Sequence, residues 1–198
     1  MTRKGVVNID QGALIWSGEH WINYLREPAA NSNSGMVSLY HTRYSSAGEG
    51  HVAFVTVPAE GLDAVCTDNP ELARFLIDTM VRGRGGLFDR DLPTVEARFT
   101  RGGATRDSPR WKIDSGAHQL MATWSEIAPP VVAQGTFREG HEHFTILFFA
   151  EQAAIRIGDR VLPGAPYRVD IWRPSIGGDR SSCVFALAET LIRLPPTS

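Results

Sequence analysis

The sequence lacks most features that identify an enzyme class or a cellular compartment. Its 198 residues include only two cysteines and carry a formal net charge of −2. No apolar run approaches the length of a membrane span or a signal-peptide core. Two distant cysteines exclude a disulfide framework and a C-x-x-C pair, so Cys66 and Cys183 are predicted to be small buried hydrophobes. The lack of such apolar runs predicts a cytoplasmic protein without a membrane partner, and the near-neutral charge predicts no nucleic-acid partner.

The common catalytic motifs are also missing. The chain has no G-x-S-x-G, no P-loop, no G-x-G-x-x-G and no H-E-x-x-H. The usual hydrolase, nucleotide-binding and zincin classes are therefore without support. On this basis no cofactor is predicted.

Turn residues, in contrast, are frequent. Glycine and proline pairs such as Pro163-Gly164 divide the chain into segments of about 7 to 12 residues, the spacing of short antiparallel strands. Several segments alternate between apolar and polar residues, as residues 94–100 do. The pattern predicts an all-β fold, with residues 1–198 forming a single antiparallel meander barrel and one domain, because closure removes exposed strand edges.

One segment has helical rather than strand periodicity. Residues 69–82 place apolar side chains such as Leu72 and Leu76 three to four positions apart, with Asp68 as the candidate N-cap. We therefore expect one α-helix near residues 69–82, inserted among the strands. The glycine-rich loop 83–91 follows, and a loop of this length acts either as a simple connector or as a lid.

Aromatic and histidine side chains are concentrated in the N-terminal third. Such a mixture can hold an apolar ligand and move protons on it, since histidine titrates near neutral pH and tyrosine can donate a hydrogen bond. The alternative is that the rings are plugs that close the end of the core. The predicted catalytic residues are His20, Tyr40 and His41, and the predicted ligand-binding residues are Trp16, Trp21, Tyr24, Arg43 and Trp124.

The C-terminal half resembles a known family of barrels. The stretches ARFTRGG, RWKIDSGAHQLMATWSEIAPPVV and FFAEQAAIRIGDRVLPG look like strand runs of calycin-type barrels, the group that includes the lipocalins, with Trp111 and Trp124 as the aromatic markers. The lipocalin Gly-x-Trp motif is absent, because Gly12 and Trp16 stand four positions apart. The resemblance implies a cavity for a small hydrophobic or aromatic molecule. The leading hypothesis adds cofactor-free acid–base chemistry of hydratase, isomerase or lyase type.

A second, partial resemblance is to the metal-binding motif of cupin barrels. Gly135, His141 and His143 follow its spacing, which would make the two histidines ligands of iron or zinc in a metal-dependent enzyme. The next acidic residue of the motif, Glu151, is eight residues beyond His143, or about 26 Å at ~3.3 Å per residue, which is too far to share a metal. No histidine follows His143 to complete the site. Metal binding is therefore kept as the alternative.

The third possibility is a solid barrel with a structural or assembly role. The segment 144–149, FTILFF, is apolar at both parities, so both of its faces are expected to be covered. Such a strand suits a deep core, and it also suits the interface of a homodimer.

Overall fold

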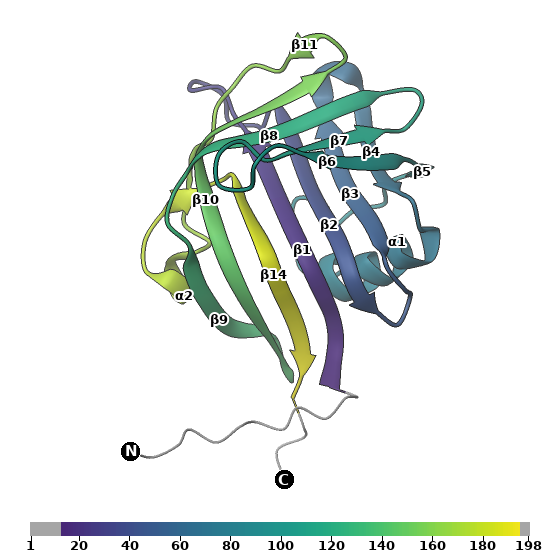
Figure 1. The fold of residues 1–198 in the computed structure, drawn as a ribbon, viewed down its shortest axis with the longest axis vertical. Coiled ribbons are helices and arrows are strands. Elements are labelled where there is room, and N and C mark those ends of the chain that lie inside the picture. Colours follow the sequence, from purple (N-terminus) through teal and green to yellow (C-terminus); the bar gives the residue numbers. More distant parts are fainter. Residues whose placement is uncertain (1–12, 195–198) are drawn as a thin grey trace.

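The computed structural model describes residues 13–194, most of which belong to one large curled sheet (Figure 1). Its strands are β1 (Leu14–Leu25), β2 (Gly35–Ser45), β3 (Gly50–Val57), β4 (Leu62–Thr67), β5 (Thr94–Glu96), β6 (Arg98–Gly102), β7 (Arg110–Asp114), β8 (Gln119–Ile127), β9 (Val131–Arg138), β10 (His141–Ile157), β11 (Arg160–Val161) and β14 (Val184–Arg193). A small second sheet pairs β12 (Arg168–Val169) with β13 (Arg180–Ser181).

The sheet curls until its two ends almost meet. Its order is β5-β4-β3-β2-β1-β14-β10-β8-β7-β6, and every pair is antiparallel except β4–β5. The end strands β5 and β6 are consecutive in the chain, separated by Ala97, whose N–H donates to the carbonyl of Thr67 at 2.8 Å. The predicted all-β barrel is confirmed, with the last strand, β14, inserted between β1 and β10.

Strand β10 connects the two layers of the barrel, one formed by β1–β5 and β14 and the other by β6–β8. Its first half pairs with β14 on one edge and β9 on the other, and its second half pairs with β8 and β11. As a result β6, β7 and β8 run across β1–β4 in Figure 1 rather than along them. This crossing leaves the outer face of the β10–β14–β1–β2 layer free to carry other elements.

The predicted inserted helix is confirmed. Helix α1 (Pro70–Leu76) continues into a π-helical turn, Ile77–Val81, and buries Leu72 against the outer face of the sheet. Its N-cap is Asn69 rather than the predicted Asp68, because the Asn69 side chain accepts hydrogen bonds from the first-turn N–H groups. Asp68 instead accepts hydrogen bonds from the backbone and ring of His51. The other helices are short: a 3-10 turn, Pro58–Glu60, and α2 (Arg173–Ile176).

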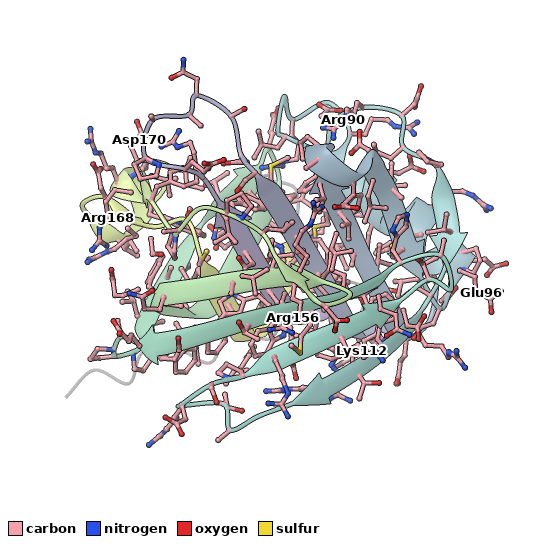
Figure 2. All side chains as sticks on the ribbon, turned by 90° about the horizontal axis from the view of Figure 1, so that it is seen from above. Arg90, Glu96, Lys112, Arg156, Arg168 and Asp170 are labelled. Atoms are coloured by element: carbon pink, nitrogen blue, oxygen red, sulfur yellow. The ribbon has the colours of Figure 1, made fainter. Side chains whose placement is uncertain are left out.

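Aromatic side chains pack in the barrel interior. The ring of Trp21 stacks on Phe185 at 4.3 Å and makes edge contacts with Trp111 and Trp124. Figure 2 shows side chains crowding the space between the two layers, whereas Glu96 and Arg168 lie at the periphery. Rings of this size account for much of the apolar area that the fold removes from water.

Both cysteines are buried, as predicted. Cys183 lies in the interior, fully buried, and Cys66 is 3% exposed. Burial raises the pKa of Cys66 to about 11 and that of Cys183 to about 12. Neither thiol is therefore a nucleophile near neutral pH.

The segment 144–149 is covered on one face only, contrary to the expectation that both are buried. Leu147 and Phe149 are buried, but Phe144 and Ile146 are exposed at 38% and 39%, beside the exposed Val132 of β9. The first half of β10 extends past the crossing strands β6–β8, so that face lacks a second layer. The predicted homodimer stays a prediction. None of the helices in residues 13–194 is long and apolar enough to cross a membrane.

Candidate functional site

The predicted site residues are divided between the two faces of the sheet. Successive side chains on a strand point to opposite faces, so the neighbours His20 and Trp21 of β1 separate, as do Tyr40 and His41 of β2. Trp21 packs in the interior core and Tyr40 in the core under α1. A β-bulge at Gly18 shifts the register of β1 against β2. Only glycine fits at this position, because a Cβ atom would clash with the carbonyl oxygen of His41.

A hollow of about 180 Å³ lies on the outer face, and we call it the outer pocket. Its floor comes from β1, β2, β10 and β14, and its sides come from the π-helical turn, β9 and the residue before α2. The described residues that line it are His20, Ile22, Tyr40, Met80, Phe137, His143, Thr145, Leu147, Trp172, Val184, Phe185, Ala186 and Glu189. The pocket thus brings together three sequence-predicted residues, His20, Tyr40 and His143.

His20 is the most constrained polar group of the outer pocket. Its ring stacks on Tyr40, with the centroids 4.0 Å apart and the planes 14° from parallel. Its Nε2 atom lies 2.9 Å from the hydroxyl of Ser38, and its Nδ1 atom lies 3.7 Å from a carboxylate oxygen of Glu189. The imidazole is therefore held in place on the pocket floor with one nitrogen directed toward an acid.

Glu189 is the residue that sequence reasoning missed. It lies on β14 opposite Thr145, whose hydroxyl donates to its Oε2 atom at 3.5 Å, and its side chain is 18% exposed. Among the described residues lining the pocket it alone carries a formal charge, if histidine is counted as neutral. The signal in the sequence was a single acidic residue inside the mostly apolar run CVFALAETLI.

The hydroxyl of Tyr40 is a hydrogen-bond donor rather than an acid in this environment. Burial of the phenol, together with the nearby Glu189 carboxylate, raises the pKa of Tyr40 well above its usual value. The side chain is 8% exposed, and its ring also packs edge-on against Trp16. At neutral pH the hydroxyl therefore stays protonated.

The two histidines of the cupin-like motif lie in different surroundings. His143 lines the outer pocket, where its ring meets Phe137 edge-on at 6.4 Å, and its buried Nδ1 atom has no hydrogen-bond partner among the described residues. His141 lies outside the lining, with its Nδ1 atom 3.0 Å from the carbonyl oxygen of Glu139. Within residues 13–194, no group of three or more His, Cys, Asp or Glu side chains is arranged to hold a metal ion.

The glycine-rich loop 83–91 reaches one wall of the outer pocket. Arg84 donates to the carbonyl oxygen of Phe137 at 3.0 Å, and its guanidinium lies 3.7 Å from the centroid of that ring. Within the loop, the carboxylate of Asp89 accepts hydrogen bonds from the backbone N–H groups of Gly83 and Gly85. The loop is therefore folded on itself and attached to β9, next to the pocket.

A second polar cluster lies inside one end of the barrel, and we call it the interior cluster. Glu19 accepts hydrogen bonds from Arg101 to both carboxylate oxygens, each at 3.0 Å, and from the indole of Trp21 at 3.0 Å. His41 stacks on His51 at 4.4 Å and lies 3.7 Å from Glu19. Its members are Glu19, His41, His51, Asp68 and Arg101.

Two groups of the interior cluster have shifted pKa values. Burial acts to raise the pKa of Glu19, but the neighbouring His41, Trp21 and Arg101 outweigh burial and lower it. For His51, burial disfavours the charged imidazolium and lowers the pKa, despite the short contact with Asp68. The cluster therefore favours an ionised Glu19 and a neutral His51.

All five predicted ligand-binding residues lie outside the lining of the outer pocket. Trp16 is buried and donates to the hydroxyl of Thr42, Trp21 and Trp124 belong to the interior core, Tyr24 is half-buried near Phe88, and Arg43 is exposed 3.8 Å from Glu19. For the four aromatic residues this placement agrees with the alternative role as core or plug residues, whereas Arg43 lies at the surface.

Comparison with known proteins gives no family for this arrangement. The chain matches no protein-family model, no curated protein and no solved structure. A functional proposal therefore rests on the geometry alone.

Proposed function

We propose that the protein binds a small, largely apolar molecule, about one ring in size, in the outer pocket. The observation that carries the proposal is the lining, in which apolar and aromatic walls surround a few polar groups, as is typical of small-molecule sites. An apolar cavity of about 150 Å³ accepts a benzene molecule, so a hollow of about 180 Å³ is large enough for one substituted ring.

The proposal moves the ligand from the interior of the barrel to its outer face. Trp21 and Trp124 are fully buried against each other inside the barrel, at a centroid distance of 5.2 Å, and this supports a structural role for both. We also propose a calycin-type relationship, which the barrel form supports. The cytoplasmic location stays a proposal from the sequence.

Titration calorimetry with indole, benzyl alcohol and cyclohexanol tests the binding proposal. We expect saturable binding of at least one of them. Ala186→Leu should weaken that binding at least tenfold, because Ala186 is 1% exposed and lines the pocket, so the larger side chain fills it. The matched control is Ala154→Leu on β10, which is half-buried and outside the lining.

Two results would overturn the proposal. One is the absence of saturable binding by any of the three compounds, which would favour the structural or assembly role. The other is an equal affinity loss in Ala186→Leu and Ala154→Leu, because the loss would then come from the fold rather than from the pocket.

Acid–base chemistry on the bound molecule is the second candidate function. It is favoured by the placement of His20 between Ser38 and Glu189, with the protonated Tyr40 stacked on it. Such groups can remove and return a proton at a carbon next to a carbonyl. Proton NMR in D₂O should show faster deuterium exchange into a bound cyclic ketone with the wild type than with His20→Asn. Equal exchange rates would leave the protein as a binding module.

A further inference from the structure

We propose that the outer pocket selects a small organic cation, a ring-bearing amine in its ammonium form, with Glu189 as its counter-charge. This inference rests on the proposed function, because it names the ligand class of the same pocket. It follows from three features of the lining: its charge, its unused hydrogen-bond capacity and its aromatic walls.

The charge of the lining has one sign. Glu189 is its one formally charged residue among those described, and neither lysine nor arginine is part of it. In a largely apolar site a lone carboxylate is costly to bury unless an opposite charge pairs with it. An ammonium group that enters the pocket removes this cost, whereas a carboxylate ligand would add to it.

The carboxylate also has unused hydrogen-bond capacity. In the described part of the chain it is contacted by the hydroxyl of Thr145 at 3.5 Å and by Nδ1 of His20 at 3.7 Å, and both contacts are long. An ionised carboxylate can accept about four hydrogen bonds. The interior Glu19, by comparison, receives three hydrogen bonds of 3.0 Å. Glu189 is therefore able to accept the N–H groups of a ligand.

The walls are suited to a cation as well. Tyr40, Phe137 and Trp172 line the pocket, and aromatic faces attract ammonium groups electrostatically. The guanidinium of Arg84 occupies one face of the Phe137 ring, 3.7 Å from its centroid, so a ligand cation would use the other aromatic faces of the lining. A carboxylate beside several aromatic rings is the usual chemistry of amine recognition.

An anionic ligand is the rival interpretation, with His20, His143 and the nearby Arg84 as its partners. Nε2 of His20 is already 2.9 Å from Ser38, and Arg84 donates to the Phe137 carbonyl. The unpartnered Nδ1 atom of His143 can accept from an ammonium group as readily as it can donate to an anion. The negative charge of Glu189 therefore favours a cationic ligand over an anionic one.

The experiment compares three ligands of one size by titration calorimetry at pH 7.5: benzylamine, benzyl alcohol and benzoate. We expect benzylamine to bind at least about tenfold more tightly than benzyl alcohol, and benzoate to bind most weakly. Glu189→Gln should weaken benzylamine binding at least tenfold and change benzyl alcohol binding less than threefold. The control is Glu142→Gln on β10, which removes an equal charge outside the lining, where Glu142 accepts from Gln134.

The outcomes separate this inference from the proposed function. Equal binding of benzylamine and benzyl alcohol, a preference for benzoate, or an equal effect of Glu189→Gln on both neutral and charged ligands overturns the cation inference while binding itself stands. The absence of binding by all three ligands overturns both. The comparison of ligands on the wild type does not depend on the folding of any variant.

Discussion

The interior cluster and the outer pocket are built from neighbouring residues of the same strands, yet the glutamates of the two sites differ in how well they are hydrogen-bonded. Glu19 and His41 face inward and His20 and Tyr40 face outward, so both sites combine a glutamate with imidazole and aromatic rings. The inward carboxylate is held by hydrogen bonds of 3.0 Å, and the outward Glu189 has contacts of 3.5 Å and 3.7 Å. Residue type alone therefore does not distinguish the two sites.

The difference arises from what covers each face. Strand β6 lies over the interior cluster and supplies complementary groups, Arg101 against Glu19 and Phe99 stacked on His51 at 5.0 Å. The outer pocket is bordered instead by Met80, Phe137 and Trp172, which contribute apolar surface. A carboxylate that its own cover satisfies stabilises the fold, and one that the cover leaves unsatisfied is available to a ligand.

Replacing one tryptophan in the barrel interior and one at the wall of the outer pocket should give the largest difference in the free energy of unfolding. Trp21→Ala is expected to lower the free energy of unfolding by about 3 to 5 kcal/mol, because it removes a fully buried ring from the interior core. Trp172→Ala should cost less than about 2 kcal/mol, because the ring is half-buried at the pocket wall. Urea unfolding followed by circular dichroism measures both. Equal losses would mean that the wall of the pocket is as much a part of the core as the interior.

Arg101→Met should produce the next largest effect. It leaves the Glu19 carboxylate, whose side chain is 9% exposed, without the donor of two of its three hydrogen bonds, and we expect a loss of about 2 to 3 kcal/mol. Adding Glu19→Gln should recover part of it, because the unpaired charge disappears. Glu189→Gln in the outer pocket should change stability by less than about 1 kcal/mol. A double mutant no more stable than Arg101→Met would show that the arginine acts through packing on Trp21, over which it lies at 4.9 Å.

Stability should also fall on mild acidification, by way of the interior cluster. The pKa of His51 is lower in the folded protein than the reference value of 6.5. As the pH falls below about 6.5, His51 becomes protonated in the unfolded chain while it is still neutral in the folded protein. The free energy of unfolding therefore falls by up to about 1.4 kcal/mol per pH unit per proton. The decline begins at the unfolded pKa and is complete below the folded one.

Urea midpoints measured between pH 7.5 and 5 check this decline, and His51→Gln should flatten it. The lowered pKa of Glu19 acts in the same direction, but below its reference value of 4.5, so the two contributions are separate. A midpoint that rises toward pH 5 in the wild type would contradict the assigned direction.

The fold could be predicted from the sequence because local patterns carry it. Alternating strands, frequent turns and one helical segment correctly indicated a barrel with an inserted helix. The N-cap was misplaced by one residue, since the choice between Asp68 and Asn69 depends on His51, which lies on a different strand. The exposure of Phe144 was also missed, because the crossing strands end before they reach the first half of β10.

The candidate site could be predicted only in part, because contacts between segments distant in the sequence complete it. His20, Tyr40 and His143 were selected by residue type, and the structure places them in one pocket. Glu189 was not, because it becomes their neighbour only through the insertion of β14 between β1 and β10, a pairing of distant segments. Alternation along a strand separates His20 from Trp21, but the sequence does not say which face carries the hollow.

The smallest effect on stability should come from His143→Phe. The buried Nδ1 atom of His143 makes no hydrogen bond with the described residues, so the substitution breaks no hydrogen bond of that atom and removes a desolvated polar group, while phenylalanine keeps a ring beside Phe137. We expect the free energy of unfolding to change by less than about 0.5 kcal/mol, as measured by urea unfolding, while binding of a ring-sized ligand changes severalfold. A large loss of stability would show that His143 is a structural partner on the outer face, and the contrast with the hydrogen-bonded Glu19 of the interior cluster would then rest on Glu189 alone.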